Sequence, residues 1–235
     1  ADFGPYHADT FTNDLHPTLK ADFIMANPPF NWKGLKIDQL QDDVRWKYGT
    51  PPAGNANFAW IQHMIHHLAP NGKIGLVLAN GALSGDGTEL AIRKKLIEND
   101  LVEAIIILPG SIFYTTDISV TLWIINKHKK ARVVMQNGKP KAYRDRSGEI
   151  LFMDLRQMGS PYEKKFIELT EDDRAKVAAT YHAWQSANET EEYKDIDEYC
   201  YSAKIYTKDL TEEQIKNGDK SVEGNNYSLV PSKYI

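Results

Sequence analysis

The residues with the most suggestive chemistry in this sequence are four consecutive ones, Asn27, Pro28, Pro29 and Phe30. Each proline fixes its own φ angle and restricts the residue before it to extended conformations, so this loop is stiff and its carbonyl groups point in set directions. The Asn27 side chain adds an amide oxygen that accepts hydrogen bonds, and Phe30 adds a flat apolar ring. Two acceptors beside an aromatic ring suit an amino group on a planar molecule.

Methylation of such an amino group needs the features that this loop offers. The N6 nitrogen of adenine is a poor nucleophile because its lone pair is delocalised into the ring. Hydrogen bonds from both N–H groups to fixed acceptors favour a pyramidal nitrogen, which localises the lone pair for in-line attack on a methyl donor. The loop contains no strong general base, so positioning and electrostatic preorganisation would supply the rate.

These four residues by themselves leave the substrate open. A base in duplex DNA must be flipped out of the stack before an enzyme reaches it, and an aromatic ring such as Phe30 helps to hold it. The same arrangement suits a base in RNA or the amide nitrogen of a protein glutamine. In isolation, Asn-Pro-Pro is also typical of a turn that closes a strand, and the surrounding elements must decide between these interpretations.

The segments around the loop predict an α/β fold. Near-continuous apolar runs predict strands covered on both faces at residues 21–26, 73–79, 102–108 and 119–126. Helical spacing predicts helices at residues 58–69, with Asn57 as the N-cap, and at residues 89–99. Strands that alternate with helices indicate a doubly wound, Rossmann-like sheet, in which ligands bind beyond the carboxyl ends of the strands. The loop at residues 27–30 follows such a strand, which favours a functional site over a plain turn.

The alternation stops after the fourth strand. Residues 127–148 are polar and rich in turn-forming types, which predicts an exposed hairpin or loop, and residues 149–155 predict a short strand. This polar stretch opens with a basic run that contains Lys127, Lys129, Lys130 and Arg132. Such a run either contacts a phosphate backbone or forms a solvated connector.

The composition changes at about residue 157. From there the sequence is acidic, and capping patterns that begin at Thr170 and Thr211 predict two helices. We therefore expect the C-terminal portion of a catalytic domain at residues 1–156. Residues 157–235 are expected to form a mostly helical extension that docks another subunit.

Composition and charge exclude several classes of protein. No apolar run approaches the roughly 18 residues needed to cross a bilayer, so we expect no membrane partner. Cys200 is the single cysteine, which excludes a disulfide framework and predicts a cytoplasmic location. The net charge of −4 is unusual for a free-standing DNA-binding protein. Any contact with nucleic acid would need a local basic surface or a partner subunit.

Longer stretches around the loop resemble a known family. Residues 27–30 resemble motif IV of the amino-methyltransferases that use S-adenosylmethionine. The wider stretches ADTFTNDLHPTLKADFIMANPPFN and RWKYGTPPAGNANFAWIQHMIHHLAPNGKIGLVLANGALS resemble the modification (M) subunit of type I restriction-modification systems. Similarity continues to GNNYSLVPSKYI at the end of the sequence. Because it spans nearly the whole chain, this resemblance is far more specific than the tetrapeptide.

The resemblance implies N6-adenine methylation of DNA by a complex with a specificity subunit and, for cleavage, a restriction subunit. It implies that the catalytic site for the target amino group is formed by Asn27, Pro28, Pro29 and Phe30. Asp9 and Phe11 resemble motif III, which lies beside the adenine of the methyl donor. Phe113 lies where related enzymes place an aromatic ring near the flipped base.

The sequence departs from the family pattern before Asp9. Family members carry a helical N-terminal domain and a glycine-rich motif I there, and motif I binds the methionine part of S-adenosylmethionine. The sequence resembles only the fourth to seventh strands of the family sheet. We therefore expect the C-terminal half of an M subunit, with an incomplete donor site and little or no activity without the missing N-terminal half. The alternative is an inactive remnant or assembly module that binds the specificity subunit.

Three histidines are the remaining candidates for chemistry. His63, His66 and His67 fall at helical spacing, but no cysteine or acidic residue nearby in the sequence completes a ligand set. We therefore expect surface or helix-packing histidines and no metal.

Overall fold

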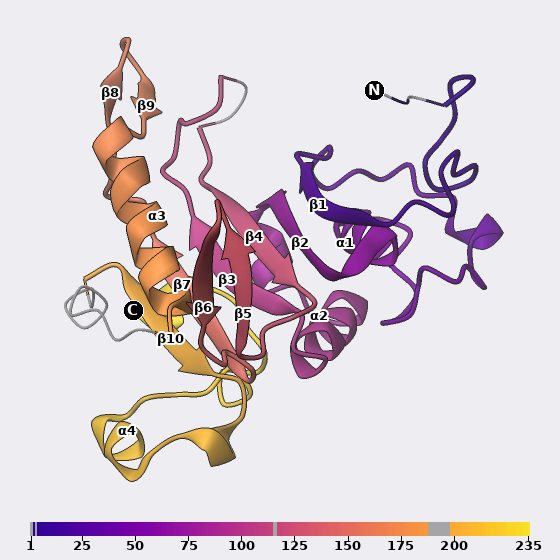
Figure 1. Ribbon diagram of the computed structural model, residues 1–235. Helices are drawn as coiled ribbons and strands as arrows, with labels where there is room; N and C mark the ends of the chain where they lie inside the picture. The colour runs from indigo at the N-terminus through magenta and orange to yellow at the C-terminus, as the bar shows by residue number, and fades with distance from the viewer. Residues whose placement is uncertain (1, 3, 115–116, 188–197) are drawn as a thin grey trace.

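The computed structural model describes residues 2, 4–114, 117–187 and 198–235. The fold is built on a six-stranded mixed sheet in the order β1-β2-β4-β3-β7-β10 (Figure 1). Its strands are β1 (Ala21–Ala26), β2 (Leu68–Ala79), β3 (Val102–Ile107), β4 (Val120–Asn126), β7 (Glu149–Asp154) and β10 (Cys200–Lys204). The predicted α/β fold is confirmed.

The strand directions define where a ligand would bind. β1 and β2 run parallel, as do β3 and β7, whereas β4 is antiparallel to both β2 and β3. The carboxyl ends of β1, β2, β3 and β7 therefore lie along one side of the sheet, which we call the carboxyl edge. The opposite side is the amino edge. Since ligands bind beyond the carboxyl ends of strands in such sheets, the loop after β1 is in the expected place for a site.

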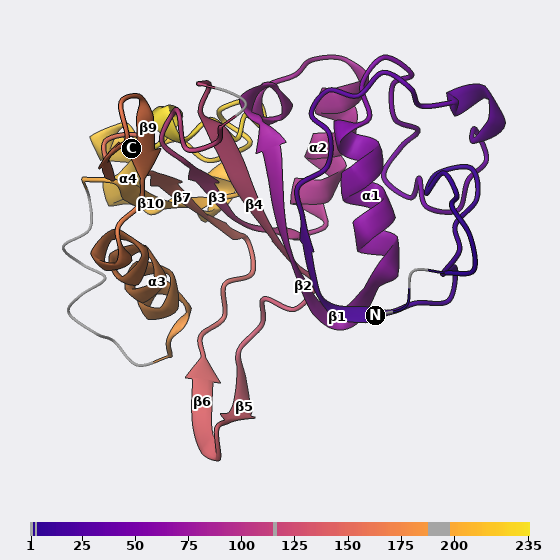
Figure 2. The same ribbon diagram turned by 90° about the horizontal axis from the view of Figure 1, so that it is seen from above.

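Helices cover the two faces of the sheet unequally. α1 (Asn57–His67) and α2 (Thr88–Glu98) lie against one face, and α3 (Glu171–Gln185) lies against the other (Figure 2). The main core lies between the sheet and the first two helices, and its fully buried side chains include Phe58, Ile61, Leu76, Leu96, Ile105 and Trp123. Each large apolar side chain buried in this way contributes about 1.5–3 kcal/mol. On the other face, Trp184 of α3 packs over Leu151 and Met153.

β1 is the outermost strand of the sheet beside the candidate site. Its Phe23 and Met25 side chains are 78% and 91% exposed on the face opposite α1. Its Ile24 and Ala26 side chains pack on the main core instead. An outer strand of this kind leaves backbone N–H and C=O groups free for another strand.

The predictions are wrong at both ends of α1 and at the start of β2. α1 ends at His67 rather than residue 69, and β2 begins at Leu68, because the chain leaves the helix in an extended conformation and pairs directly with Ala21. The helix N-cap is Ala56, not Asn57. The Asn57 side chain is buried and hydrogen bonds to Asn31, so it is not available to cap its own helix.

Residues 157–235 contain the two predicted helices and three strands that the composition did not indicate. α3 and α4 (Glu212–Asn217) begin at Thr170 and Thr211 with reciprocal side-chain and backbone hydrogen bonds, as predicted. β8 (Ser160–Tyr162) and β9 (Phe166–Glu168) form a hairpin. β10 joins the main sheet because it pairs with β7, which its own five residues could not reveal.

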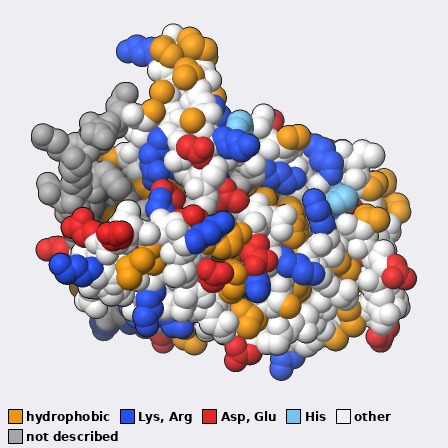
Figure 3. Space-filling view, turned by 90° about the horizontal axis from the view of Figure 1, so that it is seen from below, with side chains coloured by type: hydrophobic (Ala, Val, Ile, Leu, Met, Phe, Trp, Pro, Cys, Tyr) orange, Lys and Arg blue, Asp and Glu red, His pale blue; other side chains and the backbone are white. Residues whose placement is uncertain are grey.

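The polar stretch after β4 forms the predicted exposed hairpin. β5 (Arg132–Gln136) and β6 (Lys139–Tyr143) pair only with each other and project from the body on the same side as α3 (Figure 2). Figure 3, seen from the amino-edge side, shows this hairpin as the projection at the top. Short 3-10 helices complete the fold at Ile37–Gln39, Asn80–Leu83, Thr207–Asp209 and Pro231–Lys233. Among the described helices, none is both long and apolar enough to cross a bilayer.

Candidate active site

The Asn27–Phe30 loop leaves β1 at the carboxyl edge of the sheet. The Asn27 side chain is exposed, and no hydrogen bond from the described residues engages its amide group. Pro28 is buried, whereas Pro29 is exposed and Phe30 is half-buried. The strand thus presents a free amide oxygen and a partly accessible ring where a ligand is expected.

Two asparagines hold this loop in place, and neither was predicted as a site residue. Asn31 has a left-handed backbone with φ 52°, and its N–H donates to Asn57 Oδ1 at 3.0 Å. In return, Asn57 Nδ2 donates to Asn31 Oδ1 at 2.9 Å. Because Asn57 is the first residue of α1 and fully buried, this pair fixes the end of the loop to a helix. The sequence signal for this role was Asn31 directly after Phe30, because asparagine tolerates the left-handed backbone conformation that ends the loop.

Asp9 and Phe11 have different environments. Phe11 is buried, with its ring centre 4.4 Å from that of Trp60 and 6.1 Å from that of Trp32, with which it is stacked. Trp32 follows the loop by two residues, so these rings bring the two sequence motifs together. Asp9 is exposed, and its Oδ1 accepts the Phe11 N–H at 2.8 Å. The buried Phe11 ring therefore packs against the segment that follows the loop. Of Asp9 and Phe11, only the Asp9 carboxylate is accessible to a ligand.

Phe113 lies in the loop after β3, also at the carboxyl edge, and is half-buried. The neighbours of this loop include the β8–β9 hairpin. Ile167 N–H donates to Ser111 O at 3.1 Å, and the Tyr114 ring packs edge-on against Phe166 with centres 4.7 Å apart. Phe113 therefore lies at the same edge of the sheet as the Asn27–Phe30 loop.

The histidines of α1 meet an acidic residue that is remote in the sequence. Ligand atoms of Asp14, His63 and His67 all lie within 4.8 Å of one another. His67 Nε2 is 2.7 Å from Asp14 Oδ2, and its Nδ1 is 3.1 Å from the Leu19 carbonyl oxygen. Arg45 Nη1 donates to His63 Nδ1 at 3.1 Å. His67 therefore ties the segment before β1 to the helix, whereas His63 is held by Arg45, which also donates to the Thr10 carbonyl oxygen at 3.0 Å.

Burial sets the charge of His63. Burial, together with the neighbouring charges of His67 and Arg45, lowers the pKa of His63 to about 4. The imidazole is therefore neutral at physiological pH, which agrees with its acceptance of a hydrogen bond from Arg45.

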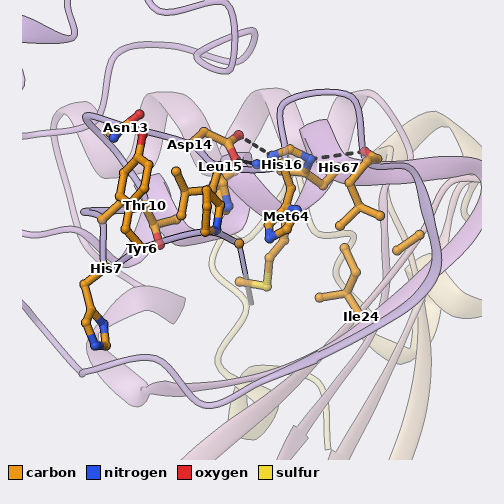
Figure 4. A pocket seen from close by; sticks show the side chains of 16 residues that line it. Tyr6, His7, Thr10, Asn13, Asp14, Leu15, His16, Ile24, Met64 and His67 are labelled. Atoms are coloured by element: carbon orange, nitrogen blue, oxygen red, sulfur yellow. Dashed lines mark hydrogen bonds and ion pairs between the residues drawn. The ribbon is translucent and has the colours of Figure 1, made fainter. Parts of the chain in front are cut away.

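A cavity of about 810 Å³ opens beside this cluster, between residues 4–21, β1 and α1 (Figure 4). Its wall combines the apolar side chains of Ile24 and Met64 with the polar ones of Thr10 and Asn13. This volume is in the range of pockets that bind cofactors and other small molecules.

Comparison with known proteins identifies the family. The protein-family model for N-6 DNA methylases matches residues 1–234 of this chain. The chain belongs to the N-6 DNA methylase family. This match confirms the resemblance found in the sequence.

The curated relatives of this N-6 DNA methylase chain are methylase subunits of type I restriction enzymes. It is 46% identical over 235 residues to the HindI methylase subunit from Haemophilus influenzae. It is 34% identical to the MjaIX methylase subunit from Methanocaldococcus jannaschii. The alignments cover 100% and 97% of this chain but only 46% and 37% of those proteins, so the chain spans less than half the length of these relatives.

A solved structure shares the fold. The methyltransferase subunit of a type I restriction-modification system from Streptococcus thermophilus superposes with a TM-score of 0.72 at 26% identity. The superposition covers 97% of this chain and 41% of that one. The N-6 DNA methylase chain therefore has part of the Rossmann-like methyltransferase sheet, as the sequence predicted.

Proposed function

We propose that this chain supplies the target-adenine part of a type I restriction-modification DNA methyltransferase. The reaction is transfer of a methyl group from S-adenosylmethionine to N6 of adenine in DNA. The observation that carries the proposal is the free Asn27 amide on a stiff loop at the carboxyl edge of a chain of the N-6 DNA methylase family. The relatives support it, since they are methylase subunits of type I restriction enzymes.

The loop would hold the amino group of a flipped adenine. The Asn27 amide oxygen and a backbone carbonyl of the two prolines accept its two N–H bonds, and Phe30 packs on the base. S-adenosylmethionine, when bound, supplies a methyl group on a sulfonium sulfur. The N6 lone pair forms the new N–C bond while the sulfur–methyl bond breaks and its electron pair stays on sulfur. The surplus proton on the amino nitrogen then leaves to water.

The scaffold around the loop supports preorganisation of this kind. The hydrogen bonds between Asn31 and Asn57, and the packing of Phe11 on Trp32, hold the loop on the sheet before any substrate arrives. Removal of one preorganised polar group from an active site typically lowers kcat by about 10²–10³.

This chain would contribute only part of the donor site. The accessible carboxylate of Asp9 and the cavity at residues 4–21 are the places we assign to the donor's adenine. The chain spans only 46% and 37% of the length of its curated relatives. Titration calorimetry with S-adenosylmethionine on the 235-residue chain should therefore show no micromolar binding, and micromolar binding would contradict an incomplete site.

Other subunits would complete the enzyme. We propose a specificity subunit that reads the DNA site, a restriction subunit for cleavage, and the N-terminal half of the M subunit. Residues 157–235, which include α3 and α4, are the proposed docking region. The relatives support an assembly with further subunits, because they are named as methylase subunits of type I restriction enzymes.

Reconstitution tests the proposal. The chain is mixed with an N-terminal M-subunit half, a specificity subunit, radiolabelled donor and site-bearing DNA. Asn27→Ala should lower methylation at least about a hundredfold. The matched control is Asn99→Ala, at the exposed C-terminal end of α2, which should leave methylation unchanged.

Two outcomes would overturn this assignment. Full methylation by the Asn27→Ala complex would remove the role given to that residue. A complex that assembles through residues 157–235 but never methylates, even with wild-type chain, would favour the assembly module instead.

A further inference from the structure

A second surface, at the amino edge, has an unusual charge. Residues 127–144 contain seven Lys or Arg and no Asp or Glu, whereas the remainder of the chain contains 21 basic and 32 acidic residues. Figure 3 shows Lys and Arg side chains gathered on this side of the molecule, between the projecting hairpin and the end of the sheet that carries β1. The overall charge of −4 therefore conceals a strongly basic region.

Most of these cations have no carboxylate partner. Within the basic region, Lys129 pairs with Asp100 at 2.6 Å and Arg144 pairs with Glu149 at 2.7 Å. The remaining cations, with two neighbours from the segments before β1 and α1, form what we call the basic band: Lys20, Lys47, Lys127, Lys130, Arg132, Lys139 and Lys141. No ion pair found among the described residues includes a member of this band.

Like charges crowd one another in the band. Burial lowers the pKa of Lys127, and the charges of Lys20 and Lys47 lower it further. The pKa of His66 is lowered by burial and then by Lys20. A hollow of about 210 Å³ lies among these groups, with Lys47, His66 and Lys127 in its wall. Lys127 Nζ donates to the Leu68 carbonyl oxygen at 2.6 Å, but no carboxylate of the described residues lines the hollow to balance the charges of Lys47 and Lys127.

The hairpin extends this row of charge away from the body. In the β5–β6 pairing, Arg132 lies opposite Tyr143, Val134 opposite Lys141, and Gln136 opposite Lys139. Directly paired residues and every second residue along a strand share a face, so the three cations line one face of the ribbon. Lys130 and Lys139 are exposed, and their ammonium groups make no hydrogen bond with the described part of the chain.

We propose that the basic band binds the phosphate backbone of duplex DNA at the amino edge, on the opposite side of the sheet from the Asn27 loop. Lysine suits this role because its ammonium is a point charge that meets phosphate without a fixed geometry. Duplex DNA presents a continuous row of phosphates, which matches a row of cations that continues from the hollow along the hairpin. The inference rests on the proposed function only in taking DNA as the polyanion.

Salt dependence of DNA binding tests the band. Fluorescence anisotropy of the 235-residue chain with a labelled duplex of arbitrary sequence, about 20 bp long, is measured from about 50 to about 200 mM NaCl. The variant Lys47→Gln/Lys127→Gln/Lys130→Gln should bind at least about tenfold more weakly at the low salt concentration. Since each phosphate contact contributes about 0.9 to the slope of log K against log salt, that slope should fall by about 2.7.

Two further variants make the measurement decisive. Lys130→Gln/Lys139→Gln changes only exposed side chains, so it should stay folded, and its slope should fall by about 1.8. The matched control Lys208→Gln/Lys216→Gln/Lys220→Gln removes three exposed lysines from the C-terminal segment and should leave the slope unchanged. Far-UV circular dichroism checks that each variant is folded.

The proposal is overturned if the band variants keep the wild-type slope, or if the control loses as much slope as they do. Loss of specificity-subunit binding with unchanged DNA binding would also overturn it, because the band would then face an acidic protein. The Asn27→Ala variant separates this inference from the proposed function. It should keep the full salt slope even where it abolishes methylation.

Discussion

The Glu103 carboxylate links several elements of the fold, and its replacement tests how they are held together. Glu103 lies on β3 and is fully buried. Its Oε1 accepts from Asn126 Nδ2 at 3.0 Å and from Arg146 Nε at 3.1 Å. Its Oε2 accepts from Tyr181 Oη at 2.6 Å and lies 3.5 Å from Lys73 Nζ. One side chain therefore connects β2, β4, the turn before β7 and α3.

The expected loss of stability follows from the charged partners of Glu103, which a neutral side chain would no longer balance. Burial raises the pKa of Glu103, but Lys73, Tyr181 and Arg146 outweigh burial and hold the pKa below its usual value. Arg146 is also fully buried, so Glu103→Gln leaves a guanidinium without its counter-charge. Breaking a buried pair in this way costs about 3–5 kcal/mol. At about 2–4 °C per kcal/mol for a chain of this size, the melting temperature should fall by about 6–20 °C.

Thermal melts followed by circular dichroism at neutral pH measure this effect. Tyr181→Phe removes one hydrogen bond to a charged acceptor and should cost about 1.5–3 kcal/mol. The control Lys94→Gln breaks the exposed Lys94–Glu98 pair and should cost less than about 0.5 kcal/mol. A Glu103→Gln variant that melts within about 2 °C of wild type would refute the reasoning, because the buried guanidinium would then not need the carboxylate.

Two smaller perturbations test the α3 cap and the Asp14–His67 pair. Thr170→Ala removes the Oγ1 that accepts the Asp173 N–H at 3.1 Å and should lower the urea midpoint by the equivalent of about 1 kcal/mol. Burial raises the pKa of Asp14, but hydrogen bonds from the His16 amide and from His67 outweigh burial and hold the pKa below its usual value of 3.8. The ionised carboxylate therefore stabilises the fold above pH 3.8. The free energy of unfolding of wild type should exceed that of Asp14→Asn there, and the difference should shrink as the pH falls through and below 3.8. A urea-derived advantage that stays constant with pH would contradict this sign.

The elements whose boundaries depend on neighbouring residues in the sequence were predicted correctly. β1 spans residues 21–26 as predicted, because an apolar run stops at two prolines that cannot continue a sheet. The caps at Thr170 and Thr211 were found because each depends on residues three positions apart. The end of α1 was misplaced because Leu68 is drawn into a strand by pairing with Ala21, which is remote in the sequence.

In the candidate site, too, features built from consecutive residues were predicted and features that join distant segments were not. The loop at residues 27–30 was visible in the sequence because its stiffness and its acceptors belong to consecutive residues. The Asn31–Asn57 pair and the Phe11–Trp32 stack were not visible, because each joins segments 21 or more residues apart. The acidic neighbour of His67 was missed for the same reason, since Asp14 reaches the helix only in the folded chain.

The sequence by itself determined the chemistry that the Asn27 loop offers, the strand that carries it and the family to which the chain belongs. Those properties depend on residue types and short spacings, which folding does not change. Only the tertiary structure decided that Phe11 packs against Trp32 beside the loop, that one buried carboxylate joins four parts of the fold, and that lysines without a carboxylate partner gather from separate segments at the amino edge. Those features depend on which side chains exclude water together, and that is set by long-range packing.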